Sequence, residues 1–119
     1  MKTFRDLLIW QKSMDFVTKI YKMSKSFPKD ENYGLTSQIR RSAVSIPSNI
    51  SEGYGRDGVN DYLRFLNIAM ASLFELQTQL EISYNLEYID KENFDSLYEL
   101  SREIERMLSS FIRSIKSKG

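Results

Sequence analysis

The stretch DYLRFLNIAMASLFELQTQL, residues 61–80, decides the fold class. Its apolar side chains recur at alternating steps of four and three residues, which is the spacing of a buried seam in a helical bundle. The seam consists of Tyr62, Leu66, Ala69, Leu73, Leu76 and Leu80. This pattern predicts a long helix over about residues 59–86. Alternation of period two, which marks a strand, is hard to find in the chain.

The same helical spacing extends to both sides of this stretch. Upstream, one amphipathic helix is expected over about residues 5–26, and a second from about Leu35 to the glycine-rich turn at 53–58. Downstream, Asp90 is the expected N-cap of a last helix that continues to the C-terminus. Because the connections are short, residues 1–119 predict a single all-α domain, an antiparallel up-down four-helix bundle.

Two details of the upstream helices are open to test. The first helix has one apolar row that should face the core and a second row beside it, and Pro28 should end it. The core row is Leu7, Trp10, Met14, Val17 and Tyr21, and the flanking row is Phe16, Ile20, Met23 and Phe27. Pro47 lies inside the second helix, where it removes the amide that would bond the carbonyl of Ala43. We expect a kink or a break into two pieces, with Ser48 or Asn49 satisfying nearby backbone groups.

The helix over residues 59–86 has more apolar surface than one buried face requires. Its apolar side chains cover about half of the circumference, whereas an amphipathic helix needs an arc of only about 100°. The polar line that remains is Arg64, Asn67, Ala71, Glu75 and Thr78. Either this helix is the most buried one of a monomer, or its surplus apolar surface contacts another subunit. Large exposed apolar patches are rare on soluble monomers, which favours a homo-oligomer.

Composition narrows the classes of function. The chain has no cysteine and no histidine, so thiolates, imidazole bases and the commonest transition-metal ligands are missing. We therefore expect no enzymatic activity, no cofactor and no metal. The longest apolar run, residues 7–10, is far short of the roughly 20 residues that span a bilayer. The N-terminus also lacks a signal peptide, and we expect a cytoplasmic protein that does not contact membranes.

Charge does not mark the whole chain as a nucleic-acid binder. Its 17 basic and 16 acidic residues give a net charge of +1, so any such role depends on local patches. Arg40, Arg41 and Arg56 are the candidates for bidentate phosphate contacts, and Tyr54 could stack on a base. In the structural alternative, the arginines pair with carboxylates of neighbouring helices and Tyr54 packs over the end of the bundle.

A second group of cations lies on the first helix. Lys12 and Lys19 share one helical face with Arg5, opposite the row that contains Trp10. A basic line of this kind could follow a phosphate backbone and supply secondary contacts. A solvated helix face is the alternative interpretation.

One long stretch and four short ones resemble a known family. The long stretch is QIRRSAVSIPSNISEGYGR, from Gln38 to Arg56. The short ones are residues 10–12, 27–28, 33–36 and 74–80. On these residues, and over about Phe4 to Ile112, the chain is similar to the four-helix-bundle proteins encoded in intervening sequences of bacterial large-subunit ribosomal RNA genes, also called S23 ribosomal proteins.

The resemblance implies an up-down bundle that assembles into a ring, usually pictured as a pentamer, and the gene location suggests contact with ribosomal RNA. Similar bundles serve as accessory subunits of reverse transcriptases in diversity-generating retroelements, where a basic ring surface holds nucleic acid. Arg40, Arg41 and Arg56 match the basic motif positions of the family. The chain departs from its relatives just afterwards, because Asp57, Asn60 and Asp61 stand in place of a more basic stretch.

Two functions from different classes follow. The first is an RNA-binding accessory protein, in which a ring repeats a weak basic patch so that avidity compensates for few contacts per subunit. The second is a structural or protein-interaction scaffold with no nucleic-acid role. An enzyme is a distant third, because only Glu52, Glu75 and Tyr54 are candidates for proton transfer and no nucleophile is paired with them.

Overall fold

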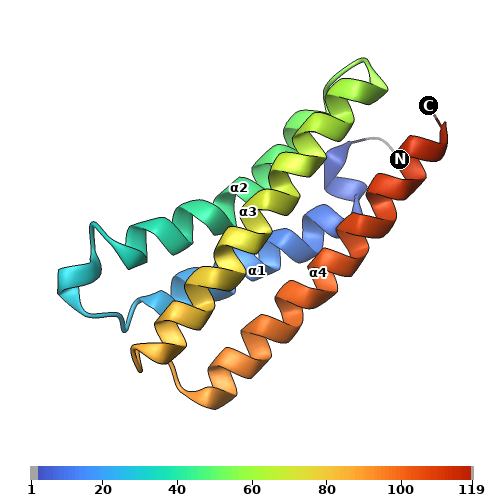
Figure 1. Cartoon of the computed structure of the whole chain (residues 1–119). Helices are drawn as coiled ribbons and strands as arrows, with labels where there is room; N and C mark the ends of the chain where they lie inside the picture. Colours follow the sequence, from blue (N-terminus) through green and yellow to red (C-terminus); the bar gives the residue numbers. More distant parts are fainter. Residues whose placement is uncertain (1–2, 119) are drawn as a thin grey trace.

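The computed structural model describes residues 3–118, which form four long helices, two short 3-10 turns and no strand. The long helices are α1 (Leu8–Ser24), α2 (Leu35–Tyr54), α3 (Val59–Asn85) and α4 (Lys91–Lys118), and the short turns are η1 (Phe4–Asp6) and η2 (Lys29–Glu31). The all-helical, four-helix prediction is confirmed. Each long helix packs against two others, and the three connections between them lie at alternating ends of the molecule (Figure 1).

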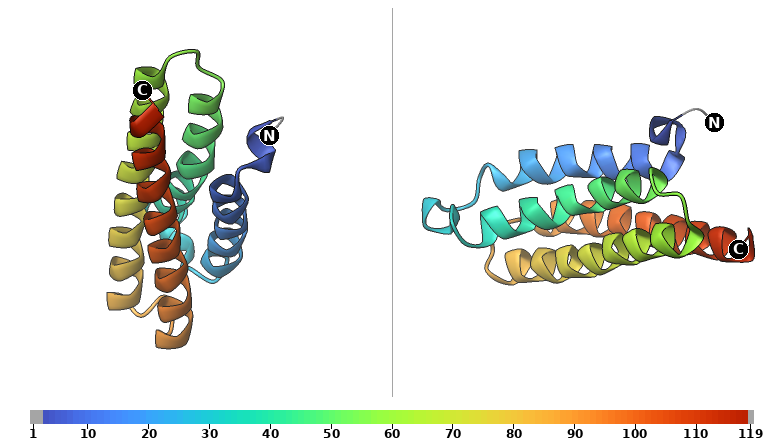
Figure 2. Two further views of the ribbon diagram at one scale, coloured as in Figure 1. Left: turned by 90° about the vertical axis from the view of Figure 1, so that its right-hand side faces the viewer. Right: turned by 90° about the horizontal axis from the view of Figure 1, so that it is seen from above.

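The helices run along a common long axis, which makes the molecule an elongated body of 45 × 25 × 21 Å (Figure 2). The seam predicted for α3 is confirmed, because five of its six members are fully buried: Leu66, Ala69, Leu73, Leu76 and Leu80. Tyr62, the sixth, is half-buried. Asp90 also acts as predicted, since its Oδ1 accepts a hydrogen bond from the backbone N–H of Asn93 at 2.8 Å, at the start of α4.

The start of the first helix differs from the prediction. Residues 4–6 form the separate turn η1, and α1 begins only at Leu8. Thr3 and Asp6 explain the interruption, because each accepts a hydrogen bond from the backbone N–H of a residue in or next to the turn. Leu7 then takes an extended conformation and buries its side chain outside the helix.

The core face of α1 also differs from the prediction. Met14 and Tyr21, assigned to the core row, are exposed, whereas Phe16 and Ile20 from the flanking row are fully buried. Serines complete the buried row: Ser13 and Ser24 each donate a side-chain hydrogen bond of 2.8 Å to the carbonyl four residues earlier. Because each of these serines satisfies its hydroxyl group within its own helix, it can lie in the core, although a pattern of apolar residues alone does not predict this.

Pro47 does not break α2, which continues without interruption from Leu35 to Tyr54. The alternative of two separate pieces is therefore wrong, whereas a kink within the continuous helix stays a prediction. Buried Ile46 and Ile50 anchor the helix to the core on both sides of the proline, so one missing hydrogen bond does not end it. Asn49 acts as expected of a polar neighbour, because its Nδ2 donates to the backbone carbonyl of Ser45 at 2.8 Å.

Candidate nucleic-acid interface

Arg40 connects α2 to the last turn of α1. Its Nε donates to Ser24 Oγ at 2.8 Å and its Nη2 donates to the carbonyl of Tyr21 at 3.2 Å. The guanidinium carbon lies 4.7 Å from the centre of the Tyr21 ring, within range of a cation–π interaction. A cation at this place also complements the negative end of the α1 dipole. Arg40 is half-buried and has no carboxylate partner among residues 3–118.

Arg41 points to a different neighbour, although it follows Arg40 directly in the chain. Its Nη2 lies 3.4 Å from Glu75 Oε2 on α3 and donates to Gln38 Oε1 at 2.6 Å. The side chain of Arg41 is 61% exposed, so this ion pair is screened by water. The pairing follows the structural alternative, yet the guanidinium remains accessible.

Arg56 lies at the far end of α2, in the connection between α2 and α3. It forms a long ion pair with Glu52, 3.9 Å between Nη2 and Oε2, and its guanidinium carbon lies 4.8 Å from the centre of the Phe65 ring. Arg64 lies 4.5 Å from the centre of the same ring and pairs with Asp61 at 3.6 Å. Both arginines near this connection thus have a carboxylate and an aromatic partner.

Tyr54 packs at this end of the bundle. Its ring meets that of Tyr62 edge to face, with 6.4 Å between centres, and Tyr62 meets Phe111 of α4 in the same manner. Burial raises the pKa of Tyr62 to about 12, and the neighbouring Tyr54 adds to this shift. The half-buried side chain of Tyr54 and its ring contact agree with the packing alternative for this residue.

Lys12 and Lys19 lie on the side of α1 that faces α4. The Nζ of Lys12 is 3.4 Å from Glu103 Oε1 of α4, and the Nζ of Lys19 is 3.0 Å from Asp15 Oδ2 of its own helix. The five predicted contact residues therefore do not form one patch. They are distributed over the α1–α4 side, the α1–α2 side, the α2–α3 side and the α2–α3 connection.

The structure reveals a set of cations that sequence reasoning missed. Lys22, Lys25 and Lys29 are exposed: Lys22 lies in the last turn of α1, and the other two lie in the connection between α1 and α2. Arg40 contacts the same turn of α1 from α2. None of these four has a carboxylate partner among residues 3–118. We call these four residues the α1–α2 cluster. A signal was present in the sequence, because no acidic residue lies between Asp15 and Asp30 while four lysines do.

The connection that carries this cluster is held by a carboxylate. Glu31 Oε1 accepts a hydrogen bond from the backbone N–H of Leu35 at 3.1 Å, and its Oε2 accepts one from the hydroxyl of Tyr88 at 2.8 Å. These hydrogen bonds, that of Leu35 first, hold the pKa of Glu31 below its ordinary value, and the bond to Glu31 raises the pKa of Tyr88. Phe27 packs its buried ring against Tyr88, 5.4 Å between centres.

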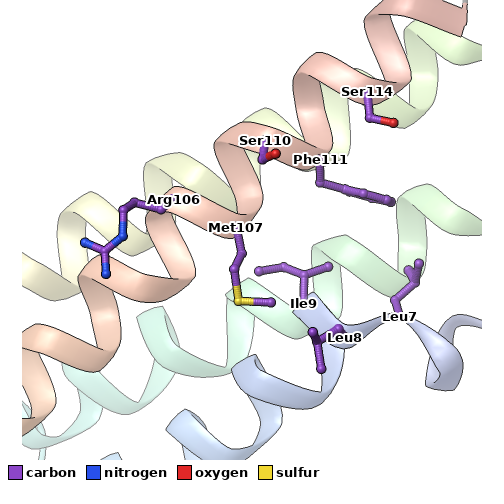
Figure 3. A pocket seen from close by; sticks show the side chains of 8 residues that line it. All are labelled: Leu7, Leu8, Ile9, Arg106, Met107, Ser110, Phe111 and Ser114. Atoms are coloured by element: carbon purple, nitrogen blue, oxygen red, sulfur yellow. The ribbon is translucent and has the colours of Figure 1, made fainter.

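Two further surface features involve the second half of α4. An apolar groove of about 550 Å³ lies between the start of α1 and the second half of α4 (Figure 3). Its apolar lining is Leu7, Leu8, Ile9, Met107 and Phe111, and Arg106, Ser110 and Ser114 contribute polar atoms. Residues 106–118 of α4 contain four cations and no acidic residue.

Within residues 3–118 no three histidine, cysteine or acidic side chains gather as a metal site, and no helix is long and apolar enough to cross a bilayer.

The fold and this surface define a small four-helix protein with an unpaired cationic cluster at one connection. The chain belongs to the family of 23S rRNA-intervening sequence proteins, whose model matches residues 5–110. It is similar to the crystal structure of a protein of unknown function from the S23 ribosomal protein family of Bacteroides thetaiotaomicron, with 31% sequence identity and a TM-score of 0.80. The match covers 88% of this chain and 98% of that one. No curated protein matches the chain.

Proposed function

We propose that this protein binds structured RNA through phosphate contacts, works as a homo-oligomer and has no enzymatic role. The observation that carries the RNA part is the α1–α2 cluster, because four cations without carboxylate partners are available to release counterions from a phosphate backbone. The description of the family, which refers to 23S rRNA, supports RNA as the ligand.

The residues predicted from the sequence supply secondary contacts in this proposal. Arg41, Arg56, Lys12 and Lys19 pair with carboxylates, but their side chains are between 38% and 61% exposed. Exposed ion pairs of this kind are worth roughly 0–1 kcal/mol, so a phosphate can compete with the carboxylate for the cation. Of the five contact residues predicted from the sequence, Arg40 alone also belongs to the α1–α2 cluster.

Assembly of several copies is supported by apolar side chains that a single chain leaves exposed. On α3 these are Val59, Ile68, Phe74 and Ile82, and Phe74 is 49% exposed. The groove between α1 and α4 offers a complementary apolar surface (Figure 3). Charge favours the same pairing, because residues 59–90 carry one basic and five acidic side chains, whereas residues 106–118 carry four basic ones. We therefore propose that α3 of one copy docks into the groove of the next.

A contact between two different faces generates a ring when the rotation closes, and the family resemblance suggests five subunits. A ring repeats the α1–α2 cluster once per subunit, so that several weak patches act together on one RNA. Sedimentation velocity tests the assembly. The mass of several chains is expected, and the variant Phe74→Glu should shift it toward that of one chain. A wild-type protein that sediments as a monomer would contradict the ring.

Salt-dependent binding to a structured RNA tests the function directly. Wild-type protein should lose affinity linearly in a plot of log Kd against log salt concentration, with a slope that reflects the number of phosphate contacts. The triple variant Lys22→Ala, Lys25→Ala, Lys29→Ala should bind more weakly with a shallower slope. A matched triple variant, Arg64→Ala, Lys91→Ala, Arg102→Ala, removes three cations that have carboxylate partners and lie outside the groove, and it should change binding much less.

The scaffold hypothesis is the second candidate, and the exposed apolar side chains of α3 favour it. It predicts an oligomer that binds no RNA even at low salt. An oligomeric wild type without any RNA affinity would therefore replace the RNA proposal with the scaffold.

A further inference from the structure

Tyr33 has an unusual environment for an aromatic residue. Its side chain is 99% exposed, whereas the next most exposed large hydrophobic side chain among residues 3–118 is Leu8 at 62%. The ring of Tyr33 makes no aromatic contact, and its hydroxyl has no hydrogen-bond partner within the described residues. Both faces of this ring are therefore open to solvent, unlike that of Tyr54.

The backbone that carries Tyr33 is fixed on both sides. Glu31 lies just before it, held by its hydrogen bonds to Leu35 and Tyr88, and the backbone N–H of Gly34 donates to the carbonyl of Glu31 at 2.9 Å. Leu35 begins α2 directly afterwards. Because the connection is already ordered, a ligand that covers the ring of Tyr33 does not have to order the loop as it binds.

Cations and carboxylates both stand in the connection that carries this ring. Lys25 and Lys29 of the α1–α2 cluster lie in it with Tyr33, and so do Asp30 and Glu31. The carboxylate of Glu31 keeps its negative charge, but its two oxygens are held by hydrogen bonds from Leu35 and Tyr88. The four cations of the cluster form no ion pair within residues 3–118, so they are available to a phosphate.

We propose that Tyr33 is a stacking platform for an unpaired base of a single-stranded nucleic-acid segment, whose phosphates contact the α1–α2 cluster. An exposed aromatic face next to cations is the arrangement by which proteins hold single strands, because every base has a flat face and a neighbouring phosphate. Bases within a duplex are stacked on one another and cannot reach this ring. The inference depends on the proposed RNA binding and specifies which part of the RNA is bound.

Fluorescence anisotropy with two labelled probes tests this inference. One probe is a single-stranded RNA of about twelve nucleotides without self-complementarity, and the other is the same sequence in a duplex. Tyr33→Ala should weaken binding to the single strand by about five-fold or more, with no change in the salt slope because no phosphate contact is removed. Its affinity for the duplex and its melting temperature should not change. Tyr33→Phe, which keeps the ring, should bind like the wild type.

The control variant is Val44→Ala, which truncates an exposed apolar side chain of α2 outside both the α1–α2 cluster and the proposed subunit contact, and it should leave both affinities unchanged. If Tyr33→Ala binds the single strand as well as the wild type does, or weakens both probes equally, stacking is wrong while RNA binding stands. If Tyr33→Ala changes the sedimenting mass, the side chain of Tyr33 is a contact between subunits and the inference is overturned. If the wild type binds neither probe, the proposed function fails first and the inference fails with it.

Discussion

The connections at the two ends of α2 each contain basic and aromatic side chains, but they use them differently. At the α2–α3 connection, Arg56 and Arg64 share the ring of Phe65, and each has a carboxylate within 4 Å. At the α1–α2 connection, the lysines have no carboxylate partner within residues 3–118, and the ring of Tyr33 is open to solvent. The types of residue are similar at both places. The difference between the two connections therefore lies in which charged and aromatic side chains the neighbouring residues leave unpaired.

The two connections also differ in how they are closed. At the α2–α3 connection, buried Gly53 allows α2 and α3 to approach so closely that no side chain fits between them. At the α1–α2 connection a carboxylate, Glu31, closes the loop through hydrogen bonds. Steric closure of this kind is insensitive to pH, whereas closure by a carboxylate depends on its ionisation.

The largest effect is expected from Gly53→Ala. A Cβ at this position would lie 2.9 Å from Tyr62 Cδ1 and 3.2 Å from the carbonyl oxygen of Tyr62, and that backbone atom cannot move aside cheaply. We expect a loss of about 2 kcal/mol in the free energy of unfolding, despite the better helix propensity of alanine. Urea denaturation measures it. Gly55→Ala is the control, because its Cβ would meet only ordinary contacts from 3.6 Å, and equal losses in both variants would contradict steric closure.

Arg40→Ala should have the next largest effect. It removes two hydrogen bonds and a cation–π contact that connect α2 to the last turn of α1, so the free energy of unfolding should fall by about 1–2 kcal/mol. Its neighbour provides the comparison. Arg41→Ala removes an exposed ion pair and should change stability by less than about 0.5 kcal/mol. The same urea series resolves the two variants, and a larger loss for Arg41→Ala would reverse this assignment.

Glu31→Gln should remove the pH-dependent contribution that the carboxylate of Glu31 makes to the stability of the protein. The pKa of Glu31 is below its ordinary value of 4.5, so its contribution is complete above pH 4.5 and is lost as the pH falls through the lowered pKa. The melting temperature of the wild type should therefore exceed that of Glu31→Gln at pH 7, and the difference should shrink toward pH 3. Asp30→Asn, which changes the neighbouring carboxylate, should show no such convergence. A difference that persists at pH 3 would contradict closure by an ionised Glu31.

The smallest effect on stability is expected from Lys25→Ala, because this side chain is exposed and forms no ion pair with any described residue. The free energy of unfolding should stay within about 0.5 kcal/mol of the wild type, while the salt slope of RNA binding should fall by roughly 0.7–0.9, the value for one phosphate contact. Arg64→Ala removes a cation from the other connection and should leave the slope unchanged. Equal slopes for the wild type and Lys25→Ala would show that Lys25 contacts no phosphate and would contradict the placing of the phosphate contacts at the α1–α2 cluster.

The seam of α3 and the cap at Asp90 could be predicted because both are local patterns. Apolar residues at bundle spacing predict a buried helix face, and an aspartate before a helix predicts an N-cap, whatever tertiary contacts surround them. The core row of α1 could not be predicted in this way. Its buried face includes Ser13 and Ser24, and a serine next to its own helical carbonyl has no distinct signature in the sequence. The same limit applies to Pro47, since burial of its neighbours decides whether the helix continues.

By itself, the sequence determined the helical class, the number and approximate extent of the long helices, and the family, because these depend on residue spacing and motif identity along the chain. Only the tertiary structure decided which cations have partners. Arg40 and Arg41 are adjacent in sequence, yet one binds the end of α1 and the other binds Glu75 of α3, because successive residues of a helix point about 100° apart and meet different neighbours. The exposure of Tyr33 was decided in the same way, by the packing of the elements around it.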